Sequence, residues 1–289
     1  MLRAVLIILC LVLAPTAARA QAPFQSTRIA VETRGRGPDV ILIPGLASTP
    51  DVWSRLADRL DDHHRVHLVA VRGFGPLAAG ANGQGSVSAP VAAEIRRYIE
   101  QQNLSRPALI GHSMGGQLAL RVAADLGDRI GRVMVVDSSP FFPGLIRPDA
   151  TTGDVEPIAR IAYQAVQFLD DRGLRTQGRA LGIELGGAAD TLFDSMGWQG
   201  GDRRVLAQGL YEVMTVDLRG RLRTITAPVT VVYGASSDRN SPRYSLGSRL
   251  RAAYAALPAV RFEPIAGAEH MVMIDQPTRF AAVVDRFLG

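Results

Sequence analysis

The stretch that decides the fold is Ala108-Leu-Ile-Gly-His-Ser-Met-Gly-Gly116. It begins as a short apolar strand, passes through a Gly-x-Ser-x-Gly motif centred on Ser113, and continues into a helix expected from about Gln117. Between a strand and a helix, this motif forms a sharp, strained turn that raises the serine hydroxyl above the sheet. The motif glycines lack a Cβ, so backbone segments can pack closely beside the turn. The stretch therefore predicts Ser113 as a nucleophile.

Apolar strands alternate with amphipathic helices on both sides of this motif. That order predicts an α/β fold with a largely parallel, twisted sheet and helices on both faces. A mostly helical interval, residues 141–225, interrupts the alternation, and we expect it to form a cap over the site. The core is then built from 21–140 and 226–289. The expected strands are 27–34, 40–43, 66–71, 107–111, 132–136, 229–233 and 260–264, and the expected core helices lie near 50–60, 87–102, 116–126, 242–256 and 277–288.

Residues 1–20 have the pattern of a secretory signal peptide. Arg3 gives a positive start, Ala4 to Leu13 form an apolar run, and Ala18-Arg-Ala20 fits a small-x-small cleavage site. The run is too short for a comfortable membrane span. We expect cleavage after Ala20 and export to the periplasm or the medium of a bacterial cell, with a retained N-terminal anchor as the alternative.

The composition excludes several kinds of partner. The net charge is +5, but the arginines are scattered, often beside Asp or Glu, and form no basic run, which argues against nucleic-acid binding. Cys10 is the single cysteine and lies in the expected leader, so the mature chain would have no disulfide and no thiolate metal site. We therefore expect no cofactor, no metal and a small-molecule substrate. The sequence does not indicate an oligomeric state.

A serine hydroxyl needs a base to take its proton, and the base needs an orienting acid. His270 follows an expected strand, and the carboxyl ends of parallel strands share the rim on which Ser113 stands. Asp238 also follows a strand and gives the order Ser…Asp…His that accompanies this kind of turn. Asp137 ends the strand after the nucleophile's own and stays open as the alternative acid.

The same chemistry needs donors for a developing oxyanion. One expected donor is the backbone N–H of Met114, the residue after the nucleophile. The second should come from the loop after strand 40–43, where Gly45 permits a turn and Pro44 has no N–H to give. The N–H of Leu46 is therefore the second candidate.

These motifs together resemble the α/β-hydrolase family in its cap-bearing, lipase- and esterase-like branch. The resemblance covers residues 27–288 and implies a Ser–His–Asp hydrolase, most simply one that cleaves carboxylic esters through an acyl-enzyme on Ser113. The same residues could instead cleave a C–C bond, an amide or a lactone, or transfer an acyl group. The alternative to an enzyme is a non-catalytic ligand-binding or sensor protein with the same fold. The resemblance rests on Ile43–Leu46, Arg72–Gly75, Gly111–Gly116, Tyr233-Gly234 with Asp238, and Gly267–His270 with Gln276-Pro277.

Overall fold

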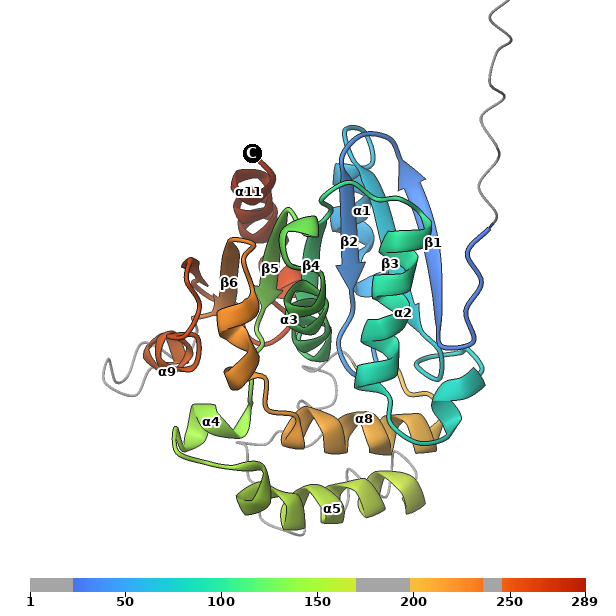
Figure 1. Ribbon diagram of the computed structural model, residues 1–289, viewed down its shortest axis with the longest axis vertical. Coiled ribbons are helices and arrows are strands. Elements are labelled where there is room, and N and C mark those ends of the chain that lie inside the picture. Colours follow the sequence, from blue (N-terminus) through green and yellow to red (C-terminus); the bar gives the residue numbers. More distant parts are fainter. Residues whose placement is uncertain (1–22, 170–197, 236–245) are drawn as a thin grey trace, which may run out of the picture.

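The computed structural model describes residues 23–169, 198–235 and 246–289. Within them, seven strands form one sheet in the order β1-β3-β2-β4-β5-β6-β7 (Figure 1). β1 pairs antiparallel with β3, and the other neighbouring pairs are parallel. The predicted α/β architecture is confirmed, whereas the expected leader and Asp238 lie outside the described residues. The strands are β1 (Ile29–Gly35), β2 (Asp39–Ile43), β3 (Arg65–Val71), β4 (Ala108–His112), β5 (Arg132–Val136), β6 (Val229–Gly234) and β7 (Val260–Ile265).

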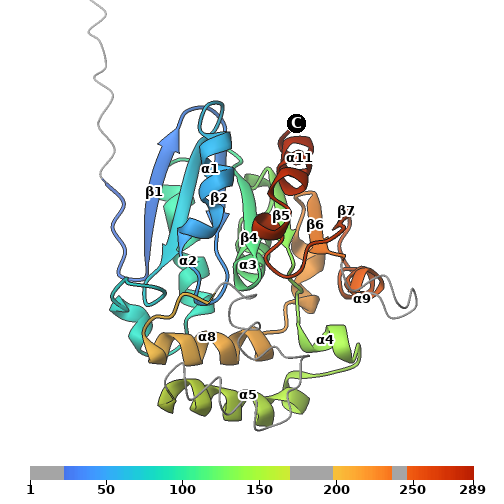
Figure 2. The same cartoon turned by 180° about the vertical axis from the view of Figure 1, so that it is seen from behind.

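Helices cover both faces of the sheet, as the alternation predicts. In Figure 1, α2 and α3 lie in front of the sheet, and Figure 2 shows α1 and α11 on the opposite face. In the described part of the chain, no helix is both long and apolar enough to cross a membrane. The described helices are α1 (Ser54–Leu60), α2 (Ser88–Gln101), α3 (Met114–Leu126), α4 (Pro143–Ile146), α5 (Thr152–Phe168), α8 (Arg203–Thr215), α9 (Leu246–Ala253), α10 (Val272–Asp275) and α11 (Pro277–Leu288), with short 3₁₀ segments η1 (Pro50–Trp53), η2 (Gly80–Gly83), η3 (Gly127–Arg129) and η4 (Arg219–Thr224).

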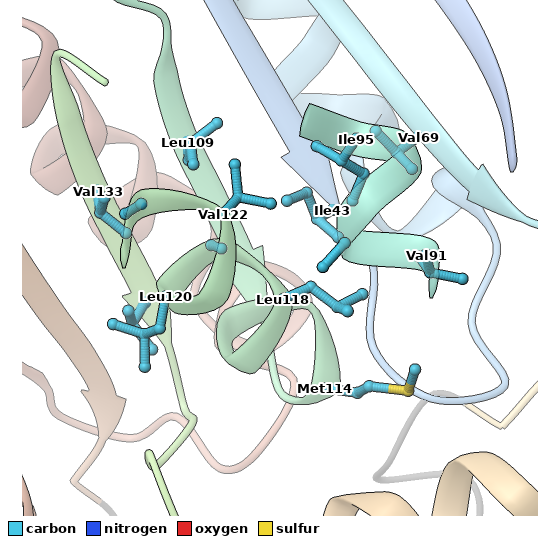
Figure 3. Close-up of a cluster of buried hydrophobic side chains, with 14 of the residues drawn as sticks. Ile43, Val69, Val91, Ile95, Leu109, Met114, Leu118, Leu120, Val122 and Val133 are labelled. Atoms are coloured by element: carbon cyan, nitrogen blue, oxygen red, sulfur yellow. The ribbon is translucent and has the colours of Figure 1, made fainter. Parts of the chain in front are cut away.

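The central strands are buried on both sides, so their side chains divide between two apolar layers. Ile41 and Ile43 of β2 point into the layer of α2 and α3, while Val40 and Leu42 point into the layer of α1 and α11. This division follows from the two-residue period of a strand. Figure 3 shows members of the first layer gathered between the strands and helices α2 and α3. The two layers fix the sheet whose strand ends carry the site.

The turn after β4 is tighter than the sequence predicts. The strand continues through His112, and α3 begins at Met114 instead of near Gln117. One residue, Ser113, therefore makes the whole connection between strand and helix. As a result, the N–H of Met114 lies in the first turn of a helix, where backbone donors have no acceptor within the helix.

The helical interval after β5 lies across the end of the sheet at which the parallel strands terminate. Figures 1 and 2 show α8 next to that end, with α5 on the far side of α8. Tyr163 of α5 and Tyr211 of α8 meet edge to face, with ring centroids 6.3 Å apart. Tyr211 also donates a hydrogen bond to the carboxylate of Glu156 on α5. We call the described residues 141–169 and 198–225 the cap.

A buried carboxylate ties the cap to the core. Glu212 of α8 is 6% exposed, and its two carboxylate oxygens accept hydrogen bonds from the backbone N–H groups of Val87 and Ser88 at 2.9 and 2.5 Å. These donors lie at the N-terminus of α2, where no side chain of its own N-cap residue accepts a bond. A negative charge is favoured at that end of a helix. The cap therefore supplies the capping group of a core helix.

We predict that Glu212→Ala lowers the free energy of unfolding by roughly 1–3 kcal/mol, because two buried N–H groups lose their acceptor. Glu212→Gln should cost less, since one amide oxygen can still accept. Urea denaturation measures both changes. The matched control is Glu100→Ala on the exposed side of α2, which should stay within about 0.5 kcal/mol of wild type. Equal stabilities for Glu212→Ala and Glu100→Ala would contradict the capping role.

Candidate active site

Ser113 stands in a strained turn at the carboxyl end of β4. Its backbone angles are φ 51° and ψ −120°, a conformation that costs a non-glycine residue about 1–3 kcal/mol. Hydrogen bonds hold it there: its N–H donates to the carbonyl of Val136, and its carbonyl accepts from the Ser138 hydroxyl at 2.7 Å. The strain is therefore maintained by the neighbouring strand β5 and the residues that follow it.

The glycines of the motif allow the turn to pack against backbone. A Cβ on Gly115 would lie 2.3 Å from the carbonyl oxygen of Ile43, and one on Gly111 would lie 2.2 Å from the carbonyl oxygen of Gly115. A Cβ on Gly45 would approach the Cβ of Ser113 to 3.1 Å. The loop after β2 is thus pressed against the nucleophile turn, as the expected pairing of Leu46 with Met114 requires.

His270 and Asp137 form a close pair beside this turn. The Nδ1 of His270 lies 2.6 Å from Oδ2 of Asp137, and both side chains are half-buried. The other carboxylate oxygen of Asp137 accepts from the N–H of Gly234 at 3.3 Å. Because Asp137 takes Nδ1–H, Nε2 is the ring nitrogen that can accept a proton.

The sequence and the structure point to different acids as the partner of His270. The chain order favours Asp238, with Asp137 as the alternative, and the structure brings Asp137 to His270. Asp238 lies outside the described residues. Asp137 leaves β5 with a left-handed φ of 44°, which turns its side chain out of the strand alternation. No spacing rule in the sequence signals that backbone conformation.

His112 contacts both the ring and the main chain of His270. It is fully buried, its ring lies against that of His270 with centroids 4.5 Å apart, and its Nε2 lies 2.9 Å from the carbonyl oxygen of His270. A carbonyl can only accept, so Nε2 of His112 carries the hydrogen. Burial, together with the nearby His270, holds the pKa of His112 well below its usual value. His112 is therefore neutral and anchors the main chain of His270.

The loop after β2 carries a second strained residue. Ala47, directly after Leu46, is fully buried with φ 57°. Helix α8 reaches the same place: a Cβ on Gly209 would lie 2.6 Å from Cδ1 of Leu46. A helical glycine costs about 1 kcal/mol relative to alanine, and here it lets the cap approach the expected oxyanion loop.

The described residues gather no metal site. Among them, no three His, Cys, Asp or Glu side chains come together as ligands would. What the arrangement can do chemically is transfer a proton from a serine hydroxyl to an oriented imidazole and stabilise an oxyanion with backbone donors.

Known proteins resemble this chain in sequence. The model of the alpha/beta hydrolase family matches residues 40–283. The pimeloyl-[acyl-carrier protein] methyl ester esterase of Aeromonas salmonicida is 32% identical over 273 residues, covering 90% of this chain and 99% of that protein. The same-named esterase of Yersinia pseudotuberculosis is 30% identical over 264 residues, covering 88% and 95%.

Solved structures share the fold. A hydrolase from Pseudomonas aeruginosa has a TM-score of 0.70 at 21% identity and covers 90% of this chain and 94% of its own. The enol-lactonase from Burkholderia xenovorans has a TM-score of 0.66 at 18% identity and covers 90% and 96%.

We predict that the free energy of unfolding falls as the pH drops below about 6.5. Burial lowers the pKa of both His112 and His67, so the unfolded chain binds these protons at a higher pH than the folded chain does. The stabilisation that the two neutral histidines add to the folded state is complete above pH 6.5. It is lost on acidification, by at most about 1.4 kcal/mol per pH unit for each histidine. Urea denaturation from pH 7.5 to 5.5 measures it, and a constant free energy would contradict it.

Proposed function

Because the chain belongs to the alpha/beta hydrolase family, we propose that it is an exported serine hydrolase that cleaves carboxylic esters through an acyl-enzyme on Ser113. The observation that carries the proposal is the His270–Asp137 pair beside the strained serine turn. A strained turn supports a nucleophile, and an imidazole oriented by a carboxylate supports a general base. The sequence relatives named as methyl ester esterases support an ester as the substrate. Export rests on the pattern of residues 1–20.

In the proposed reaction, Oγ of Ser113 attacks the ester carbonyl while Nε2 of His270 takes its proton. Asp137 stabilises the imidazolium through Nδ1–H, and the backbone N–H groups of Leu46 and Met114 bind the oxyanion. The intermediate collapses, and His270 gives its proton to the departing alcohol. Water then attacks the acyl-enzyme with His270 again as base, releasing the acid and restoring the serine.

We predict that the wild-type protein hydrolyses p-nitrophenyl esters and that Ser113→Ala abolishes this, together with labelling by a fluorophosphonate probe. A series of acyl lengths from acetate to laurate, with one lactone and one anilide, measures the preferred bond. Ester turnover that depends on Ser113 supports the proposal. A wild type that is not labelled contradicts it.

Expression with the native leader should place the protein in the periplasm or medium, and retention in the cytoplasm contradicts export.

We predict that Asp137→Asn lowers kcat by a factor of about 10³–10⁴, because an amide neither selects the required imidazole tautomer nor stabilises the imidazolium. Asp238→Asn is the matched control and should lower kcat less than about tenfold. Ester hydrolysis and the rate of fluorophosphonate labelling measure both variants. The opposite ranking would return the role of the acid to Asp238.

A further inference from the structure

The last described residues before α8 form a strap between two core loops. We define the cap strap as residues 198–202. On one side it pairs with the loop after β3: the N–H of Gly75 donates to the carbonyl of Gly200 at 3.0 Å, and the N–H of Asp202 donates to the carbonyl of Gly73 at 2.8 Å. On the other side it meets the loop after β2. The cap strap is therefore held against the core at the edge of the site.

Gln199 makes both contacts with the loop after β2. Its backbone N–H donates to the carbonyl of Ala47 at 2.8 Å, and its side-chain Oε1 accepts from the backbone N–H of Thr49 at 2.5 Å. One residue of the cap thus holds two backbone groups, the carbonyl of Ala47 and the N–H of Thr49, in the loop that carries Leu46. Ala47, whose carbonyl accepts from the Gln199 N–H, is the residue with the left-handed φ of 57°.

The two hydrogen bonds from Gln199 affect the direction in which the Leu46 N–H points. A left-handed φ is unfavourable for alanine, so without restraint the peptides around Ala47 would relax toward a more ordinary conformation. Relaxation there would rotate the neighbouring peptides and with them the donor at Leu46. Within the loop, the Ser48 N–H donates to the carbonyl of Gly45 at 3.3 Å. The contacts of Gln199 with the Ala47 carbonyl and the Thr49 N–H restrict the loop further, from the side of the cap. Oxyanion stabilisation depends on donors that are fixed before the reaction begins.

We infer that Gln199 is a positioning residue for the oxyanion hole: from the cap, it holds the strained loop so that the Leu46 N–H points at the developing oxyanion. This inference rests on the proposed function, since it assigns a role within that reaction. It also makes the cap a structural part of the catalytic apparatus, because the donor keeps its direction only while the cap strap is in place.

The test uses three variants of the full chain. Gln199→Met keeps the length of the side chain but removes the acceptor for Thr49. Gln199→Glu keeps an acceptor oxygen and should restore the function. Gln164→Met makes the same chemical change at an exposed position of α5, distant from the loop in sequence. Thermal unfolding of each variant shows that folding is preserved.

The readouts are kcat and KM for p-nitrophenyl butyrate, and the inhibition constant of a trifluoromethyl ketone, whose adduct carries an oxyanion. For Gln199→Met we expect kcat to fall about 10- to 100-fold, less than or comparable to loss of a whole donor. KM should change less than twofold, and the inhibition constant should rise by the same factor as kcat falls. Gln199→Glu should recover most of the loss, and Gln164→Met should match wild type.

Fluorophosphonate labelling distinguishes a failure of the proposed function from a failure of the inference about Gln199. If wild type is not labelled at Ser113, the proposed function fails and the inference fails with it. If wild type is labelled and Gln199→Met keeps the wild-type kcat and inhibition constant, the inference alone is overturned. A rise in KM without a change in the inhibition constant also overturns it, because Gln199 would then contact substrate instead of positioning a donor.

Discussion

The structure depends on one constraint, the packing of backbone against backbone around Ser113. Three glycines leave room around the unfavourable conformation of Ser113. A Cβ on Gly115 would meet the carbonyl oxygens of Ile43 and Pro44, one on Gly111 would meet the backbone of Gly115, and one on Gly45 would meet the side chains of His112 and Ser113. Any side chain at Gly115 would collide with carbonyl oxygens of the loop after β2. The sheet order, which places β4 between β2 and β5, makes that meeting possible. The proposed nucleophile, the proposed oxyanion donors and the proposed base are therefore brought together by adjacent strands and by glycines that have no side chain.

The residues after β5 serve the serine and the base at the same time. Asp137 contacts His270, and the next residue, Ser138, donates to the carbonyl of Ser113. Beneath them the fully buried Tyr254 donates to the carbonyl of Ser138 at 3.0 Å. Burial, reinforced by the charge of Asp137, raises the pKa of Tyr254 well above its usual value, so the donor hydrogen is kept. A displacement of this short segment would therefore change the positions of both Ser113 and His270.

The sequence predicts what local patterns control. Strand 132–136 and helix 277–288 appear with the expected bounds, because burial follows their strand and helix periods. The turn at Ser113 follows from its glycines. The choice between two acids does not, because both acids follow neighbouring parallel strands and no spacing pattern signals the left-handed φ with which Asp137 leaves β5. Glu212 and Gln199 were missed for a related reason: each meets its partners more than 120 residues away, and no spacing pattern marks such a pair.

The carboxylate of Glu212 has a consequence for how such proteins diversify. Caps are the segments in which relatives of one fold can differ while the sheet stays the same. Here the first turn of a core helix is completed by a residue of the cap, so a transplanted cap would bring its own loops and leave α2 uncapped. A chimera built from this core needs an acidic side chain at the same point of the incoming helix. Exchange of caps is therefore restricted by the stability of the recipient core as well as by the shape of the substrate.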